Sequence, residues 1–213
     1  PYLDEIDELS SHVGSINTVV NEDDRLIGYS TDGPGAMRAL AAAEVETAGR
    51  SILLIGSGGA ARAVAFSLTT SKVPPQLAIL GVEEDELELL GSDLAEKTPV
   101  NPTTQRFSSE VLREAMSHAD VVIQATPIGM TPNVDETILP ADLIKEEQVV
   151  FDIVYTPLET RLIKEAKRAG AVTVEGLGMF VHQAAVQFEL WTGRDAPIEL
   201  MTETVRTALG EAG

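Results

Sequence analysis

The residues of this sequence whose spacing most clearly implies chemistry are glycines that follow a short apolar stretch. Residues 52–55 are apolar, and Gly56, Gly58 and Ala61 then form a G-x-G-x-x-A pattern. In such a pattern Gly56 permits a tight turn, Gly58 lets the backbone approach a pyrophosphate, and Ala61 allows a helix to pack closely on a strand. The free N–H groups at the start of that helix would face the phosphates. The pattern predicts a dinucleotide-binding loop, and a purely structural turn is the alternative.

Other glycine-rich motifs do not fit this segment. A P-loop requires Gly-Lys-Ser/Thr after its glycines, and no such sequence follows here. The nucleophile turn of α/β-hydrolases requires glycine where Ile55 stands. Neither nucleotide hydrolysis by a P-loop nor a serine nucleophile at this turn is therefore expected.

The residues after the second expected strand bear on which dinucleotide is bound. An acid there usually contacts the ribose 2′-hydroxyl of NAD, whereas an arginine accommodates the 2′-phosphate of NADP. Here Gly81 and Val82 are followed by four acids, residues 83–86, and no base is present. Taken locally, this segment favours NAD. The alternative is that the acids only form the first turn of the next helix, where they complement its dipole.

Polar residues that could bind a second ligand are scattered along the chain. They lie at Asn17-Thr18, at Thr31-Asp32-Gly33, in residues 152–157 and in residues 176–183. The last two segments follow expected parallel strands, and ligands of such sheets bind at the carboxyl ends of the strands.

Each of these residues also has a purely structural interpretation. Asn17 could form a turn, Asp32 could cap a helix before Pro34, Tyr155 could be a packing ring, and Gln183 could be a solvated helix position.

From residue 50 onward, short apolar runs alternate with stretches of helical periodicity, which is typical of βαβ units. Six strands with crossover helices predict an α/β fold with a doubly wound, mostly parallel, Rossmann-like sheet. The expected strands are residues 51–55, 77–80, 103–107, 121–125, 149–154 and 171–174. The expected helices are residues 60–70, 84–97, 109–118 and 158–169.

The two ends of the chain do not continue this alternation. Residues 1–30 predict an acidic helix and then a hairpin of residues 16–20 and 26–29 around a turn at 21–25. Residues 179–191 and 197–209 predict two C-terminal helices. We therefore expect residues 1–31 to be the remnant of a smaller substrate lobe, residues 32–176 to bind the dinucleotide, and residues 177–213 to pack toward the lobe.

Composition excludes several classes of protein. The 213 residues contain no cysteine, which removes disulfides, thiolate nucleophiles and Cys-ligated metals, and no metal site is expected. The net charge of −19 argues against nucleic acid or an anionic membrane as a partner. No apolar run approaches the roughly 18 residues of a membrane span. We expect a cytoplasmic protein with a small-molecule substrate.

Six motifs in order together resemble the shikimate dehydrogenases, including the related quinate/shikimate dehydrogenases. The motifs are residues 14–19 (GSINTV), 28–33 (GYSTDG), 56–63 (GSGGAARA), 124–130 (QATPIGM), 151–157 (FDIVYTP) and 176–185 (GLGMFVHQAA). The resemblance implies an NADP-dependent oxidoreductase acting on a CH–OH group. Its reaction would be the reduction of 3-dehydroshikimate to shikimate in chorismate and aromatic amino-acid biosynthesis.

The resemblance also implies roles for individual residues. Asn17 and Asp32 would bind substrate hydroxyls, Asp32 would lie beside the family's catalytic lysine, and Gln183 and Tyr155 would also border the substrate. The nicotinamide would perform the hydride transfer while the protein orients it. The cofactor would be lined by Gly56, Ser57, Gly58, Gly59, Ala60, Thr126, Ile153, Gly176 and Met179.

Two departures from the family leave alternatives open. The family's Pro-His-Lys motif would fall before Pro1, and no lysine of this sequence lies in a matching motif. We therefore expect a fragment that is inactive alone, preceded by or fused to further chain before Pro1. The family's Asn-Arg-Thr element is replaced around Gly81-Val82-Glu83. We expect NADP from the family norm; an NAD-dependent quinate/shikimate dehydrogenase or a non-catalytic dinucleotide-binding module is the alternative.

Overall fold

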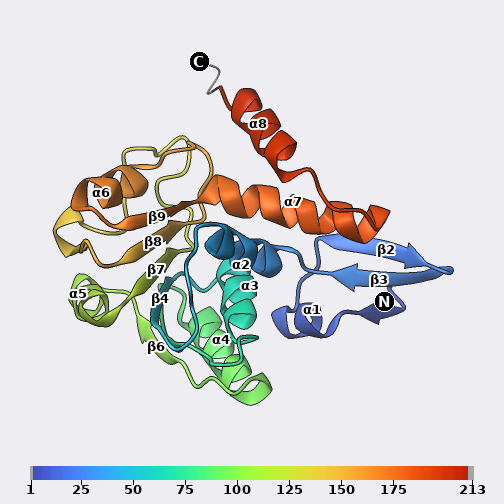
Figure 1. Ribbon diagram of the computed structural model, residues 1–213. Coiled ribbons are helices and arrows are strands. Elements are labelled where there is room, and N and C mark those ends of the chain that lie inside the picture. The colour runs from blue at the N-terminus through green and yellow to red at the C-terminus, as the bar shows by residue number, and fades with distance from the viewer. Residues whose placement is uncertain (1, 211–213) are drawn as a thin grey trace.

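Six parallel strands form the larger sheet of the computed structural model, which describes residues 2–210 (Figure 1). Pro1 and the last three residues of the expected C-terminal segment lie outside the described residues. The strand order is β6-β5-β4-β7-β8-β9, so the chain starts at the centre, moves to one edge and returns to the other side of β4. The predicted doubly wound sheet is confirmed. The strands are β4 (Ser51–Ile55), β5 (Gln76–Gly81), β6 (Thr103–Arg106), β7 (Val121–Gln124), β8 (Val149–Asp152) and β9 (Val172–Glu175).

Helices cover both faces of this sheet, and the alternation of strand side chains decides which helix meets which face. Ile52 and Leu54 belong to one buried cluster with α3 and α4, whereas Leu53 and Ile55 belong to another with α5 and α6. The central strands β4, β7 and β8 are almost wholly apolar because both of their faces are buried, whereas the edge strand β6 is polar and largely exposed. The covering elements are α3 (Gly59–Leu68), α4 (Glu84–Lys97), α5 (Ser109–His118), the 3-10 helix η1 (Ala141–Leu143) and α6 (Arg161–Ala169).

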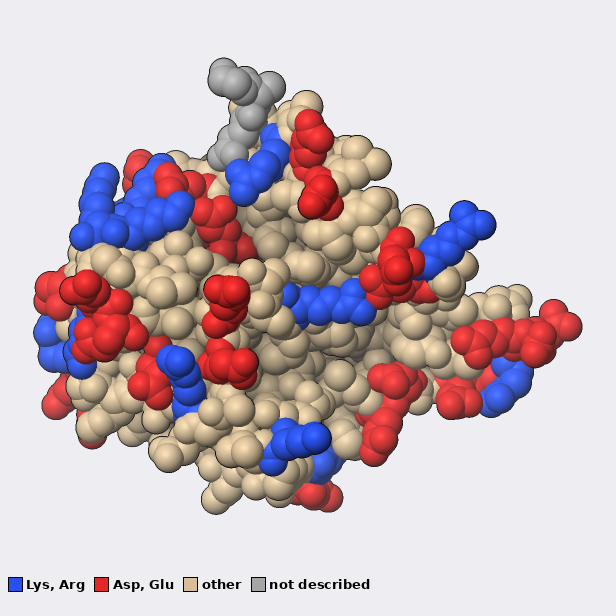
Figure 2. All heavy atoms as spheres, in the orientation of Figure 1, with Lys and Arg blue, Asp and Glu red and all other residues tan. Residues whose placement is uncertain are grey.

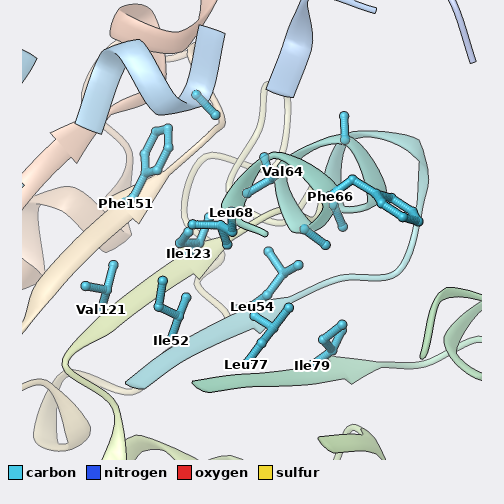
Figure 3. Packing of buried hydrophobic residues seen from close by; sticks show 14 of the residues in the cluster. Ile52, Leu54, Val64, Phe66, Leu68, Leu77, Ile79, Val121, Ile123 and Phe151 are labelled. Carbon is cyan, nitrogen blue, oxygen red and sulfur yellow. The ribbon is translucent and has the colours of Figure 1, made fainter. Parts of the chain in front are cut away.

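The core under α3 shows this packing directly. Figure 3 shows side chains of β4, β5 and β7 pointing toward Val64, Phe66 and Leu68 of α3. These three side chains are fully buried. Burying an apolar side chain of this size stabilises the fold by about 1.5–3 kcal/mol. Helix α3 is therefore packed firmly on the sheet, and this packing fixes the position of the glycine-rich turn that precedes it.

The N-terminal residues form a second, three-stranded sheet beside the first. Its order is β1-β3-β2, and the expected acidic helix is α1 (Glu8–Val13). The hairpin turn is tighter than the predicted span 21–25, because Asp23 and Asp24 both adopt positive φ values of 50° and 65° and close a two-residue loop. The two-residue β1 was not predicted, since it is too short to show a period. The strands are β1 (Glu5–Ile6), β2 (Thr18–Glu22) and β3 (Arg25–Tyr29).

Helices α2 (Asp32–Ala42) and α7 (Gly176–Thr192) connect the two sheets, and α8 (Ile198–Ala208) packs against α7. In Figure 1, α7 runs from the end of β9 to the hairpin of β2 and β3. Its Trp191 Nε1 donates to the Val19 carbonyl over 3.1 Å. An Arg38–Glu189 ion pair of 2.7 Å joins α2 to α7. Helix α7 therefore belongs to both parts of the molecule.

Helix boundaries differ from the predictions where tertiary contacts decide them. Residues 158–160 are not helical: Thr160 caps α6 by accepting from Ile163 N, while its hydroxyl donates to the buried Asp152. Helix α7 begins at Gly176, three residues before the expected start. None of the helices within residues 2–210 is both long and apolar enough to cross a membrane.

Charged side chains are spread over the surface rather than gathered at one end. Figure 2 shows acidic side chains dispersed over the visible face, with lysine and arginine side chains grouped near α6. Most of the ion pairs between described residues leave one or both side chains well exposed, so each adds little stability. Arg62 is the clearest exception, because only 17% of its side chain is exposed.

Arg62 joins α3 to the N-terminal segment. Its Nε donates to the Val13 carbonyl over 2.5 Å, and one terminal nitrogen lies 2.7 Å from the His12 carbonyl. The guanidinium also pairs with Asp93 of α4, which in turn accepts from Lys97 over 2.7 Å. One side chain thus satisfies carbonyls at the end of α1 that have no partner within that helix.

We predict that Arg62→Met lowers the free energy of unfolding by about 2 kcal/mol, because partly buried carbonyls lose a charged donor. Urea denaturation measures this difference. Arg113→Met is the matched control: its 3.7 Å pair with Asp142 is exposed, and its removal should change stability by about 0.5 kcal/mol or less. Equal losses in the two variants would contradict the assigned role of Arg62.

Candidate functional site

The glycine-rich turn lies between β4 and α3, at the carboxyl edge of the larger sheet. Gly56 has φ 126°, and a Cβ there would lie 2.5 Å from the Ala125 carbonyl oxygen, so no other residue fits. Gly58 is the N-cap of α3. A Cβ at Gly58 or Gly59 would meet nothing within 4 Å. The start of α3 therefore faces open space with free N–H groups, as a pyrophosphate requires.

Two polar side chains at the ends of β7 and β8 hold the neighbouring loops. Gln124 Nε2 donates to the carbonyls of Thr126 and Ile128 over 3.0 and 3.1 Å, and its Oε1 accepts from Thr126 N. Asp152 accepts from Val154 N over 3.1 Å and from Thr160 Oγ1 over 2.6 Å. These contacts fix the loops that contain Thr126 and Ile153. Strand order places the loop after β7 next to the glycine-rich turn and the loop after β8 one strand further along the same edge.

Asp152 is fully buried, and burial raises its pKa to about 6 although hydrogen bonds from Thr160 and Val154 N oppose the shift. The folded protein therefore binds a proton more tightly than the unfolded chain. The stabilisation from the neutral form is complete below the ordinary value of 3.8 and is lost as pH rises toward 6.

Gly176 and Met179 come from the first turn of α7. A Cβ at Gly176 would clash with the Val154 carbonyl oxygen, so glycine is needed for α7 to start against the loop after β8. Tyr155 of that loop stacks on Phe180 with ring centroids 4.4 Å apart. The structure thus brings Ile153, Tyr155, Gly176 and Met179 to one place.

Asn17, Asp32 and Gln183 form a second cluster, joined through Thr31. Asn17 Nδ2 donates to Asp32 Oδ1 over 3.0 Å, and Asn17 Oδ1 accepts from Thr31 N over 3.1 Å. The Thr31 hydroxyl lies 3.2 Å from both Asn17 Oδ1 and Gln183 Oε1. Three segments that are distant in sequence therefore converge as amide and carboxylate groups, which suits recognition of a polyhydroxylated ligand.

Asp32 is the first residue of α2, and Thr31 occupies the N-cap position without a side-chain cap bond. The alternative that Asp32 caps this helix is wrong, since its carboxylate accepts from Asn17 instead. Burial raises the pKa of Asp32, while the Asn17 hydrogen bond opposes the shift. A partly desolvated carboxylate at this position is ready to gain from a cationic partner or a ligand hydroxyl.

The sequence indicates Thr31 only as part of a polar segment and gives no role to Gln187, yet both side chains position the cluster. Thr31 connects the cluster, and Gln187 Nε2 donates to Thr18 Oγ1 over 3.0 Å, which in turn donates to Asn17 Oδ1. Gln187 follows Gln183 by four residues, so both lie on one face of α7. That spacing was the available signal.

The acidic segment after β5 reaches the glycine-rich turn. Ser57 Oγ donates to Glu86 Oε2 over 3.3 Å, and Glu83 is the N-cap of α4 without a side-chain cap bond. No cluster of three or more His, Asp or Glu side chains suited to a metal ion occurs in residues 2–210.

We predict that wild-type protein loses about 2 kcal/mol of unfolding free energy relative to Asp152→Asn between about pH 4.5 and 7.5. The asparagine keeps an acceptor for Val154 N but carries no charge to desolvate. Urea unfolding of both proteins across this range gives the difference. A difference that stays constant with pH would contradict the assignment.

Known proteins resemble this chain in sequence and in fold. Residues 176–206 match the shikimate 5′-dehydrogenase C-terminal domain. The shikimate dehydrogenase (NADP(+)) of Moorella thermoacetica is 41% identical over 210 residues, which cover 99% of this chain and 71% of that protein.

Solved structures match over the same extent. Shikimate 5-dehydrogenase of Listeria monocytogenes, in complex with shikimate and NAD, has a TM-score of 0.88 at 36% identity, covering 96% of this chain and 72% of that one. The Thermus thermophilus enzyme, in complex with NADP(H) and shikimate, has a TM-score of 0.81 at 32% identity, covering 97% and 73%.

Proposed function

Because the chain belongs to the shikimate dehydrogenase family, we propose that it binds NADP at the glycine-rich turn and a shikimate-type substrate at the Asn17–Asp32–Gln183 cluster. The reaction of this family is the NADP-dependent reduction of 3-dehydroshikimate to shikimate. The single observation that carries the proposal is that helix α7 reaches both groups of residues. It lines the nucleotide loops with Gly176 and Met179 and contributes Gln183, one turn later, to the second cluster.

The residues present fit the cofactor. The turn formed by residues 56–60 presents backbone N–H groups to open space, so it would hold the pyrophosphate. The nicotinamide supplies the hydride when the cofactor is bound. Thr126, Ile153 and Met179 would keep the ring in place, on loops that Gln124 and Asp152 fix.

The substrate side would use the polar cluster. Asn17, Gln183 and Tyr155 would orient substrate hydroxyls, and Asp32 would accept one hydroxyl and orient a cationic proton donor. No lysine within residues 2–210 pairs with Asp32: Lys97 and Lys167, for example, pair with acids on α4 and around α6. The described residues therefore place no lysine beside Asp32 to perform the role of the family's lysine, and inactivity of these 213 residues alone stays a prediction.

The domain limits and location belong to the same proposal. Residues 1–31 would form part of the substrate lobe, residues 32–176 the dinucleotide-binding domain, and residues 177–213 the helices that pack toward the lobe. The Trp191–Val19 hydrogen bond supports that packing. A cytoplasmic location fits the absence of cysteine.

We predict that Gly58→Val weakens NADPH binding at least about 100-fold, a loss of about 2.8 kcal/mol, because its side chain would occupy the space of the pyrophosphate. The variant should fold normally, since Gly58 has an ordinary φ of −71° and a Cβ there meets nothing. Gly56→Ala is the contrasting variant, and it should lower stability because of its 2.5 Å clash. Calorimetric titration and urea unfolding separate the two effects; unchanged affinity in Gly58→Val would refute the assignment.

We predict that Asp32→Asn weakens shikimate binding to the NADP complex about 10-fold, because a hydrogen bond to a charged acceptor contributes roughly 1.5 kcal/mol or more. Its unfolding midpoint should barely change. Titration with shikimate at saturating NADP⁺ measures the effect. Asp195→Asn, an exposed change between α7 and α8, is the control. A loss equal in both variants would exclude a substrate role for Asp32.

A further inference from the structure

Arg106 ends β6, the edge strand that pairs with the carboxyl end of β5 (Figure 1). We propose that Arg106 binds the 2′-phosphate of NADP and so replaces the base that is missing after β5. The assignment rests on the proposed function, and it names a specificity-determining residue that lies on the neighbouring strand instead of in the segment following β5.

The register of the two strands sets the direction of this side chain. Gly81 pairs with Arg106, and Phe107 N donates to the Gly81 carbonyl over 2.8 Å. Paired positions of parallel strands project from the same face of a sheet. A Cβ at Gly81 would lie 2.9 Å from Ser57 Oγ. The face from which Arg106 projects is therefore the face that leads to the glycine-rich turn.

Thr104 supports the same direction independently. It lies two residues before Arg106 and so on the same face of β6. Its Cγ2 would be 2.7 Å from a Cβ at Gly91 of α4. Arg106 therefore follows Thr104 on the α4 side of the sheet, at the last position of the strand.

Gly81 has no side chain, and Ser57 of the glycine-rich turn packs where its Cβ would lie. Gly56 N donates to the Leu80 carbonyl over 2.7 Å, so the glycine-rich turn, the end of β5 and Arg106 follow one another across the sheet edge. Neighbouring strands lie about 4.8 Å apart. An extended, exposed arginine is long enough to cross that distance along the outside of Ser57 and would meet a phosphate on the ribose.

Charge identifies Arg106 as the available base. Arg62 and Lys97, on α3 and α4, are both paired with Asp93. The guanidinium of Arg106 is exposed and forms no hydrogen bond or ion pair with any residue among 2–210. Arginine binds phosphate through two parallel hydrogen bonds. The four acids of residues 83–86 would make an unpaired phosphate costly here, so this contact would decide between the two cofactors.

The test compares NADPH and NADH binding to wild type, Arg106→Gln and Arg113→Gln by fluorescence titration. We expect Arg106→Gln to weaken NADPH binding at least about 10-fold, the typical effect of losing a charge-assisted contact. NADH affinity should stay within about 2-fold, and the control on α5 should behave as wild type. Adenosine 2′,5′-bisphosphate should lose affinity in the same variant, whereas 5′-AMP should not.

Each contrary result has a distinct meaning. NADPH affinity that is unchanged in Arg106→Gln, or NADPH and NADH affinities that fall equally, would overturn the assignment and leave the proposed function standing. A wild-type chain that binds neither dinucleotide would overturn the proposed function and this assignment together. Urea unfolding of Arg106→Gln shows whether the variant is folded, and Arg106→Lys should recover part of the NADPH affinity because it restores the charge.

Discussion

The close approach of α7 to two other segments is the constraint on which both halves of the proposed site depend. A Cβ at Gly35 would lie 2.7 Å from Gln183 N, and a Cβ at Gly176 would clash with the Val154 carbonyl. Any larger residue at either glycine would push the helix outward. Met179 and Gln183 lie in one continuous helix, so their relative positions are fixed. The two contacts then place both residues against the rest of the chain, and in the proposed site they would set the distance between cofactor and substrate.

Most of the larger sheet could be predicted, because apolar runs and helix caps are local signals. Helices α4 and α5 begin and end at the predicted residues, and Ser108 caps α5 by accepting from Val111 N. The start of α6 could not be predicted in this way. It depends on a hydrogen bond from Thr160 to Asp152, and nothing near Thr160 in the sequence shows that this carboxylate is buried beside it.

The candidate site also has one part that could be predicted from the sequence and one part that could not. The glycine-rich turn acts through its backbone, so its residues can be recognised from their order alone. The polar cluster depends on contacts such as that of Thr31 with Gln183, which are 152 residues apart. The proposed role of Arg106 could not be predicted from residue order either, because Arg106 adjoins the end of β5 only through the pairing of Gly81 with Arg106 in the sheet.

Electrostatics explains why only a few groups could select between NADP and NAD. A chain with a net charge of −19 gains little from its overall field when it binds an anion, and salt screens that field beyond about 8 Å. The pyrophosphate would be held by neutral N–H groups and the end of α3, whose effect is short-ranged. A 2′-phosphate has no such backbone site, and most nearby bases already pair with acids. With the proposed role of Arg106, discrimination between NADP and NAD would come from the balance of one exposed guanidinium against the acids at the start of α4.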